Sequence, residues 1–456
     1  MNKNLLKFFA IFLFGFFASQ QALAEISLSI TANQNSKTKI LFYGFDKLIN
    51  PQIADPNSLE FQLEQDREKI FNQIKKNLNS TNLFEVIVNN SSKQHINQNP
   101  QLNISSTPDF AKFKNSEIEL IIIADFQYDQ SGNLDLKIRM WDLIDQKQIF
   151  GKSYNASEDN YRKVANLISD EIFKATTGEA VGHFNSQILY VSESGSIKKR
   201  IKKINLISFD GEDKKILTDG RDLVLTPSFS KKRDEILYLR YYDNKPQLFF
   251  LNLKNQRSYK VGGFRGTTFA ASPHPNKSDI ILISAIEEGN TDVYELNVNE
   301  NIARKLTKSL AIDTTASYSP NGKSIIFSSD REGGQKIFLM DIDGTSIKRI
   351  SLGSGSYSKP IWSPDGKLIA FTKIKDNKFY IGIMSSDGTN EKLLTSSYIV
   401  EGAKWSPNGR YLIYSKKKGA FGKDSIPRLY TIDIVTGFEY EIPTPEGEGA
   451  TDPDWL

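Results

Sequence analysis

KPIWSPDGKLIAF, residues 359–371, contains a tryptophan, a Ser-Pro-Asp-Gly turn and an apolar run within thirteen positions. Two other stretches repeat this order of residue types, TASYSPNGKSIIF at 315–327 and GAKWSPNGRYLIY at 402–414. Proline presets φ to about −65° at the first central position of a turn, Asp or Asn is tolerated at the second, and Gly accepts a positive φ. The pattern therefore predicts a strand that ends at an aromatic residue, a tight turn, and a second strand that is buried.

Six equivalent positions appear when the aromatic residue of each stretch is placed in register. They are separated by 44, 45, 44, 43 and 50 residues. A period of about 40–50 residues is typical of the four-stranded blade of a β-propeller. We expect these side chains to pack between blades, so that truncating such a tryptophan costs about 3–5 kcal/mol. The six positions are Phe229, Pro273, Tyr318, Trp362, Trp405 and Trp455.

The two ends of the repeat region are incomplete in complementary ways. The first unit begins at Gln187 without the strand that precedes the turn, whereas residues 451–456 form such a strand with nothing after it. Joined together, residues 187–222 and 450–456 make one complete blade. The sequence therefore predicts an all-β, six-bladed propeller over residues 183–456, closed by its C-terminal strand, which removes the exposed edges of an open sheet.

The first 24 residues have the features of a secretory signal peptide. Two lysines precede an apolar run over residues 8–17, which is too short to span a membrane, and residues 22–24 form a small-residue cleavage pattern. Cleavage between Ala24 and Glu25 would leave an exported chain. The sequence contains no Cys, which excludes a lipid-anchored lipoprotein and a disulfide framework.

Residues 25–182 lack the repeat and mix strand and helix patterns. Leu63, Ile70, Ile74 and Leu78 share one helical face, and a second helix follows Ser157, which we expect to cap it. These elements predict a small α/β domain, with a mobile loop over the polar residues 89–114. Strands are predicted at residues 26–30, 39–43, 120–126, 134–142 and 148–154.

Overall charge and composition argue against several classes of function. The formal net charge is +4, and the two lysines of the signal peptide account for half of it, so the electrostatic footprint of a nucleic-acid-binding protein is missing. Only three His occur, far apart, and Cys is absent, which gives a transition-metal site little support. We expect no cofactor, no nucleic-acid partner, no membrane-spanning segment and a monomeric chain.

Two basic runs fall at corresponding places of two repeat units. KKRIKK at 198–203 lies where the first hairpin of blade one should turn, and KKK at 416–418 lies at the equivalent place in blade six. We interpret both as solvated loops. An anionic target, such as lipid or peptidoglycan, is the alternative.

The junction between the two parts carries a more specific pattern. Residues 168–172 are ISDEI, followed by Thr-Gly-Glu at 177–179, Phe184 and ILYV at 188–191. Together with the signal peptide, the small α/β domain and the WSPDG repeats, this junction resembles the TolB family of the periplasmic Tol-Pal envelope system. The resemblance covers roughly residues 25–456, and its local departures are Phe229 and Pro273 in place of Trp and Lys231 in place of Pro.

The resemblance implies a periplasmic, non-enzymatic binding protein. TolB proteins hold Pal, the peptidoglycan-associated lipoprotein, on the propeller and offer their mature N-terminus to TolA. The system supports outer-membrane integrity and constriction at division, and some bacteriocins exploit it. The TolA-binding residues implied here are Glu25, Ile26, Leu28 and Ile30. The Pal-binding residues implied by the loops entering the inner strands are Thr267, Ala270 and Thr314, to which the same loop register adds Arg265, Tyr357, Ser358 and Glu401.

A propeller hydrolase or lyase is the alternative function. Positions three and four residues before each aromatic position should surround one mouth of the channel, and only Glu401 and Asp452 are acidic there, with Lys359 among them. An axial catalytic pocket would have to use this pair. No G-x-S-x-G pentapeptide occurs, which argues against a propeller peptidase. The twelve mouth positions are Leu225, Thr226, Phe269, Ala270, Thr314, Thr315, Ser358, Lys359, Glu401, Gly402, Thr451 and Asp452.

Overall fold

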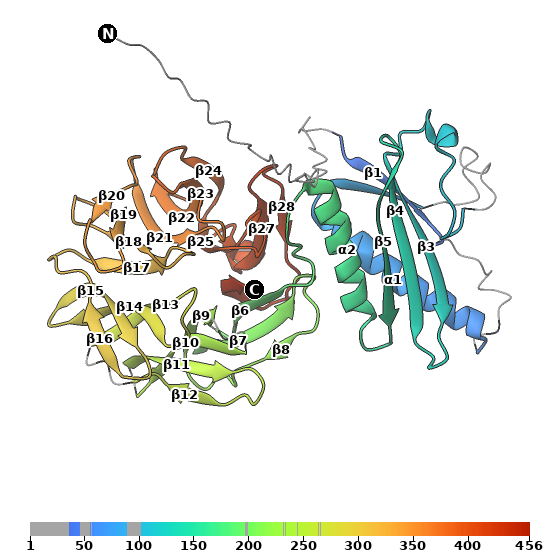
Figure 1. Cartoon of the computed structure of the whole chain (residues 1–456). Helices are drawn as coiled ribbons and strands as arrows, with labels where there is room; N and C mark the ends of the chain where they lie inside the picture. The colour runs from blue at the N-terminus through green and yellow to red at the C-terminus, as the bar shows by residue number, and fades with distance from the viewer. Residues whose placement is uncertain are drawn as a thin grey trace, which may run out of the picture.

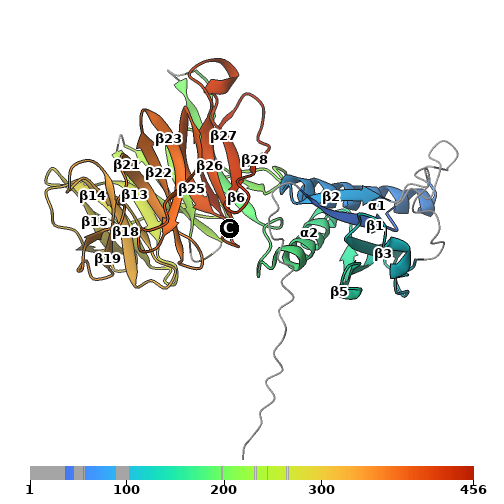
Figure 2. The same ribbon diagram turned by 90° about the horizontal axis from the view of Figure 1, so that it is seen from above.

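The computed structural model has an α/β part before residue 178 and a ring of six sheets after residue 186 (Figure 1; seen from above in Figure 2). It describes residues 36–45, 55, 57–88, 102–196, 199–230, 232, 234–243, 245–262, 264 and 266–456. The strand predicted at 26–30 lies outside the described residues, as do the signal peptide and residues 89–101 of the predicted loop.

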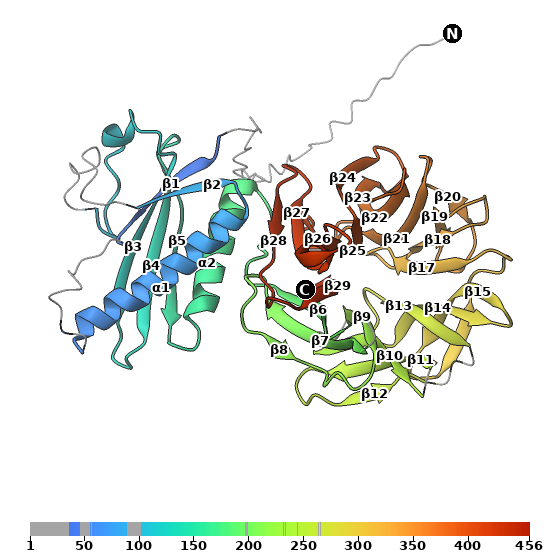
Figure 3. The same ribbon diagram turned by 180° about the vertical axis from the view of Figure 1, so that it is seen from behind.

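The first part is a mixed five-stranded sheet with both helices on one face (Figure 3). Its strand order is β2-β1-β3-β4-β5, with β2, β1 and β3 parallel and the last pairings antiparallel. Strand β2 is an element that the sequence pattern did not reveal. The bounds are β1 Thr38–Tyr43, α1 Leu59–Ser80, β2 Phe84–Val88, β3 Leu120–Tyr128, β4 Leu134–Asp142, β5 Lys147–Ala156 and α2 Tyr161–Thr177.

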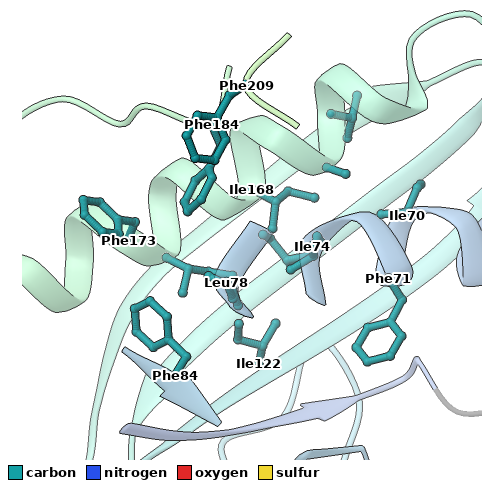
Figure 4. Packing of buried hydrophobic residues seen from close by; sticks show 14 of the residues in the cluster. Ile70, Phe71, Ile74, Leu78, Phe84, Ile122, Ile168, Phe173, Phe184 and Phe209 are labelled. Atoms are coloured by element: carbon teal, nitrogen blue, oxygen red, sulfur yellow. The ribbon is translucent and has the colours of Figure 1, made fainter. Parts of the chain in front are cut away.

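Strand alternation divides the core of this part into two layers. Side chains such as Ile122 point to the helix side, where they meet Ile74 and Leu78 of α1 and Ile168 of α2 (Figure 4). Their neighbours on the strands point to the opposite face, because successive side chains of a strand alternate. Ile121 lies there in a second buried cluster. Full burial of each such side chain stabilises the fold by about 1.5–3 kcal/mol.

Two expectations for this part are wrong. Ser157 does not cap α2, since the N-cap residue is Asn160 and no side chain bonds to the helix start; only the carbonyl of Ser157 accepts, from the amides of Asn160 and Tyr161. The described half of the predicted mobile loop packs on the sheet, with Leu102 and Phe113 buried in the second cluster and a short 3-10 helix at Phe110–Phe113. Scattered apolar residues were enough to hold this polar segment in place.

The second part is the predicted six-bladed propeller, with four antiparallel strands in each blade. The inner strand of each blade lines the axis and is followed outward by three more. Blades one to three contain β29 Gly449–Trp455, β6 Gln187–Ser194, β7 Ile201–Ser208 and β8 Lys215–Ile216; β9 Val224–Phe229, β10 Glu235–Tyr242, β11 Lys245–Asn252 and β12 Ser258–Lys260; and β13 Thr267–Pro273, β14 Ile280–Glu287, β15 Asn290–Asn297 and β16 Ile302–Lys305. Blades four to six contain β17 Asp313–Tyr318, β18 Ser324–Ser329, β19 Lys336–Asp341 and β20 Lys348–Arg349; β21 Ser356–Trp362, β22 Leu368–Lys375, β23 Lys378–Ser385 and β24 Lys392–Ser397; and β25 Ile399–Trp405, β26 Tyr411–Lys417, β27 Arg428–Asp433 and β28 Glu439–Glu441.

The predicted closure of the ring is confirmed. Strand β29 pairs with β6, so that Trp455 faces Ile188 in the register, and Gln187 and Leu456 exchange backbone hydrogen bonds of 2.9 and 3.0 Å. The six equivalent positions of the repeat, which we call the aromatic column, are the last residues of the six inner strands. The C-terminal strand therefore completes the blade that begins at Gln187.

Because all six inner strands run in the same direction, the propeller has two unlike ends. The turn end carries the S-P-(D/N)-G turns that follow the inner strands. In one of them Ser363 accepts at its carbonyl from the amide of Gly366 over 2.9 Å, and Gly366 has a φ of 73°. The mouth end carries the starts of the inner strands and the connections between second and third strands.

The α/β part contacts the propeller at the turn end, through a polar and an apolar cluster. The buried Asp210, in the turn after β7, accepts hydrogen bonds from Gln73 Nε2 (2.8 Å) and Arg162 Nη1 (2.9 Å). Beside it, Phe184 and Phe209 pack over α2 (Figure 4), and their ring centroids are 5.8 Å apart. Residues from both parts therefore share one continuous core.

The segment between α2 and β6 is fixed by a helix side chain. Asp170 of α2 accepts hydrogen bonds from the backbone amides of Phe184 (2.8 Å) and Asn185 (3.3 Å). A Cβ at Gly182 would lie 2.1 Å from the Asp170 carboxylate, so this close approach requires glycine. The link between the two parts is thus held by specific hydrogen bonds.

Candidate protein-binding site

The inner strands share an irregularity near the mouth end. The register of each inner strand with its neighbour shifts once, as in a β-bulge. In five of the six, the residue three positions before the aromatic column has a left-handed φ, between 46° and 72°; blade three, where Ala270 holds this place, is the exception. Such backbone strain persists only where the surrounding structure imposes it, and it gathers at functional sites. The five residues are Thr226, Thr315, Lys359, Gly402 and Asp452.

These bulges surround a channel of about 140 Å³ on the propeller axis. The six residues that lie three positions before the aromatic residue of each unit all line this channel. This confirms one of the two sets of positions that were predicted to form the mouth. The residues four positions before the column, such as Thr314 and Ser358, do not line it. The wall is otherwise made mostly of Ala, Pro and Ser side chains.

The charged side chains at the channel are mostly paired. The Lys359 ammonium lies 2.7 Å from the Glu401 carboxylate, and Lys404 lies 3.6 Å from Asp454. Asp454 also accepts from the amide of Phe229 over 2.7 Å. Burial raises the pKa of Asp452, while the positive charge of Lys359 lowers it. An axial hydrolase would need Glu401 and Asp452. Lys359 thus already forms an ion pair with the first of these carboxylates and lowers the pKa of the second.

The part of the chain that the structure describes also offers no set of ligands for a metal ion. No group of three or more His, Asp or Glu side chains lies close enough there to hold an ion. Among the described residues, the channel therefore offers a surface of small side chains with paired charges.

The residues implied for Pal binding differ in where the structure places them. Thr267 begins β13 at the mouth end and is exposed, and Glu401 is exposed as well. Ala270 is half-buried and lines the channel, whereas Thr314 is 9% exposed. Ser358 is half-buried in β21. Arg265 lies outside the described residues, as do Ala24, Glu25, Ile26, Leu28 and Ile30.

Tyr357 is not a surface residue, which corrects the expectation drawn from loop register. Its side chain is fully buried, because it lies on the face of β21 that packs against blade four. The ammonium groups of Lys336 and Lys373 lie 5.2 and 4.5 Å from its ring centroid, and its hydroxyl is 2.6 Å from Glu391. Burial, followed by the bond to Glu391, raises its pKa above the usual range. Tyr357 therefore stabilises the seam between blades four and five.

Exposed apolar side chains at the mouth end were missed by the sequence analysis. Every blade contributes at least one, and Leu310, Phe421 and Leu352 are 99%, 89% and 73% exposed. Hydropathy could have drawn attention to them, but only the fold places them on one end of the ring. We call this set the apolar ring: Ile201, Leu223, Tyr241, Tyr242, Ile286, Leu310, Ile312, Leu352, Ile374, Tyr398 and Phe421.

Both parts of the chain match TolB family models. Residues 173–456 match the TolB beta propeller domain, and residues 47–149 match the TolB amino-terminal domain. The Tol-Pal system protein TolB of Gluconobacter oxydans (strain 621H) is 36% identical over 391 residues, which cover 85% of this chain and 83% of that protein. None of the helices in the described part of the chain is both long and apolar enough to cross a membrane.

Solved structures agree on the fold. TolB from Acinetobacter baumannii matches with a TM-score of 0.78 and 22% identity, over 92% of this chain and 97% of that one. A chain of Kuenenia stuttgartiensis hydrazine synthase matches with a TM-score of 0.50 and 13% identity, over 60% of this chain and 47% of that one, so propellers of this shape also occur in enzymes. On the family models and the Gluconobacter relative, this chain belongs to the TolB family.

Proposed function

We propose that this chain is a periplasmic, non-enzymatic binding protein of the Tol-Pal system, which holds Pal at the mouth end of its propeller. The observation that carries the proposal is the apolar ring around the channel mouth. Exposed apolar side chains gathered at one end of a protein are typical of a protein-binding surface. Membership of the TolB family supports Pal as the partner.

The chemistry of the mouth favours a protein ligand over a small substrate. A small-molecule site needs a few convergent polar groups in a deep pocket, whereas this channel has small side chains and paired charges. The aromatic members of the apolar ring, Tyr241, Tyr242, Tyr398 and Phe421, are of the residue types enriched in protein interfaces. The partner would cover the ring and insert only a few side chains into the channel.

The test uses exposed and channel-lining positions of the mouth. Thr267→Glu and Ala270→Glu each place a charge on the proposed surface, and we expect them to weaken Pal binding in calorimetry by about tenfold or more. Thr436→Glu, in the exposed turn after β27 at the other end of the strands, is the matched control and should bind normally. Normal affinity in both mouth variants, with unchanged melting temperatures, would remove this surface from the proposal.

We further propose that TolA binds the mature N-terminus, Glu25, Ile26, Leu28 and Ile30. Only three of these side chains are apolar, and burying each contributes about 1.5–3 kcal/mol, from which the entropy of ordering the segment must be subtracted. Docking of this segment on its own protein would be marginal, which suits a segment that is released to a partner. Deleting residues 25–35 should abolish TolA binding and leave Pal binding unchanged. Normal TolA binding by the deletion variant would contradict this assignment.

In the cell, these two interactions would support outer-membrane integrity and constriction during division. A strain that produces the Thr267→Glu variant at the normal level should leak periplasmic proteins. Bacteriocins that use the Tol-Pal system would meet the same mouth surface.

A further inference from the structure

The two basic runs of the sequence meet at the mouth end of adjacent blades. The first run covers the end of the turn between β6 and β7 of blade one and the start of β7, and its described basic members are Lys199, Arg200, Lys202 and Lys203. The second run, Lys416 to Lys418, lies where β26 of blade six ends. Both runs occupy the hairpin between the second and third strands, as predicted, and blades one and six are neighbours because β29 closes the ring.

The closing strand β29 lies between the two hairpins and connects them across this seam. The amide of Ala450, in β29, donates to the carbonyl of Pro427 at the end of the blade-six hairpin over 2.8 Å. A Cβ at Gly449 would lie 3.1 Å from the Pro427 ring and 3.3 Å from Glu193 Cβ. Glu193 in turn holds Arg200 of the first run at 2.7 Å. We call this surface the basic seam: Lys199, Arg200, Lys202, Lys416, Lys417, Lys418 and Arg428.

Some cations of the basic seam are neutralised within the protein. Glu193 pairs with Arg200 and Lys202, Glu439 pairs with Lys416 over 2.7 Å, and Glu441 pairs with Arg428 over 3.2 Å. These pairs use carboxylates of the same two blades, and the other lysines of the seam take part in none of them.

Three lysines of the seam form no ion pair with any residue that the structure describes: Lys199, Lys417 and Lys418. The ammonium group of Lys417 lies 5.6 Å from the ring centroid of Tyr398, and that of Lys418 lies 5.2 Å from the ring centroid of Tyr430. Lys199 and Lys418 are exposed. Each run therefore presents an exposed cation outside an ion pair, although the hydrogen bond to Tyr430, followed by the charges of Glu441 and Asp424, raises the pKa of Lys418.

A hollow of about 600 Å³ lies beside these cations. Its charged lining consists of three cations, Lys416, Lys418 and Arg428, and three carboxylates, Asp424, Glu441 and Glu446. Phe421, a member of the apolar ring, is in the same hairpin. Cationic and aromatic side chains next to a hollow are typical of the energetically important parts of protein interfaces.

We infer that the basic seam binds an acidic segment of the same protein partner that occupies the mouth. This inference rests on the proposed function, because the seam is continuous with the apolar ring through Tyr398 and Phe421. The unpaired lysines favour carboxylate side chains, and the hollow admits them. The carboxylates of Asp424 and Glu446 make the surface mixed in sign, which favours a protein segment over a uniformly anionic lipid surface or polymer.

The experiment removes one unpaired cation from each run. Calorimetry with purified Pal compares the intact protein, the double variant Lys199→Gln/Lys418→Gln, and the two single variants, at low and high ionic strength. We expect the double variant to bind about three- to tenfold more weakly at low ionic strength. The difference should shrink at high ionic strength, because salt screens exposed charges.

A matched control has the same change of charge at the turn end. Lys277 and Lys323 are exposed, follow the inner strands of blades three and four, and form no ion pair with a described residue. The double variant Lys277→Gln/Lys323→Gln should keep the affinity and the salt dependence of the intact protein. Net charge alone would lower the affinity of both double variants equally, and that result would overturn the inference.

The remaining outcomes separate this inference from the proposed function. Pal binding by the intact protein together with unchanged affinity of Lys199→Gln/Lys418→Gln overturns the inference alone. No Pal binding by the intact protein overturns the proposed function and the inference with it. Sedimentation with phosphatidylglycerol vesicles that the double variant loses, while Pal binding stays unchanged, would assign the seam to a lipid surface and overturn the inference.

Discussion

The indole nitrogen of Trp455 donates a hydrogen bond to the hydroxyl of Ser186, 2.6 Å away in space and 269 residues earlier in the chain. The Trp455 ring also stacks on Phe209, with ring centroids 5.6 Å apart and an interplanar angle of 15°. Ser186 belongs to the segment between α2 and β6. One side chain at the C-terminus thus joins the closing strand of the propeller to the junction with the α/β part.

Replacing Trp455 by Phe should destabilise the protein more than the same change at Trp362. Trp455→Phe keeps an aromatic ring and removes the hydrogen bond to Ser186, for an expected loss of about 1–2 kcal/mol in the free energy of unfolding. The indole nitrogen of Trp362 is buried without a partner among the described residues, so Trp362→Phe should be nearly neutral. Urea unfolding followed by circular dichroism measures both, and equal losses would contradict the role given to Ser186.

Neutralising Asp210 should loosen the contact between the two parts. Asp210→Asn removes the charge that faces Arg162 and weakens the bond from Gln73, and loss of one partner of a buried pair costs about 3–5 kcal/mol at most. We expect faster proteolysis in residues 178–186 and a lower melting temperature. Asp213→Asn, three residues later in the same turn and exposed, is the control. Proteolysis at the same rate in both variants would show that Asp210 does not hold the junction.

The stability of the junction should fall on acidification because of His183. Burial, and then the charge of Arg410, lowers its pKa to about 3, whereas an unfolded chain titrates at about 6.5. Its stabilising contribution is therefore complete above pH 6.5 and is lost as the pH falls toward 3, by up to about 1.4 kcal/mol per pH unit. His183→Phe should flatten this dependence in urea midpoints measured across the window. An unchanged slope would mean that another group titrates.

Asp170 should act in the opposite direction over an overlapping window. Burial raises its pKa to about 6, although the amides of Phe184 and Asn185 oppose the shift. Because this folded pKa lies above the ordinary value of 3.8, the contribution of Asp170 is complete below pH 3.8 and is lost as the pH rises through 6. Asp170→Asn should therefore lose stability more steeply on acidification than the intact protein. The exposed Asp159→Asn should follow the intact protein, and parallel curves for all three would contradict the prediction.

The architecture was predictable because its signals are local. The aromatic residue, the turn and the buried strand recur within thirteen positions, and Trp362 and Trp405 carry them clearly enough to place Pro273 in the same column. The closing strand was predictable for the same reason, since residues 451–456 repeat the start of a unit. In the α/β part, helical periodicity revealed α1, whereas the short parallel strand β2 has no distinctive alternation and was missed.

The candidate site was only partly predictable, because it depends on which side of a strand faces the axis. Register from the aromatic column placed Ala270, Lys359 and Asp452 correctly at the channel. The same register suggested Tyr357 as a surface residue, yet strand alternation buries it between two lysines. Leu310 and Phe421 belong to different blades and lie at the same end of the ring only because every blade runs in the same direction around the axis.

The amino-acid sequence by itself determined the blade count, the closing strand and the family resemblance, since each depends on residues close together in the chain or on a fixed period. The tertiary structure decided which side chains share a surface. The apolar ring contains residues of all six blades, and the basic seam joins runs more than 200 residues apart. The hydrogen bond from Trp455 to Ser186 joins two residues that are 269 positions apart in the chain. These relationships arise from ring closure, which brings distant segments together through packing that no local pattern encodes.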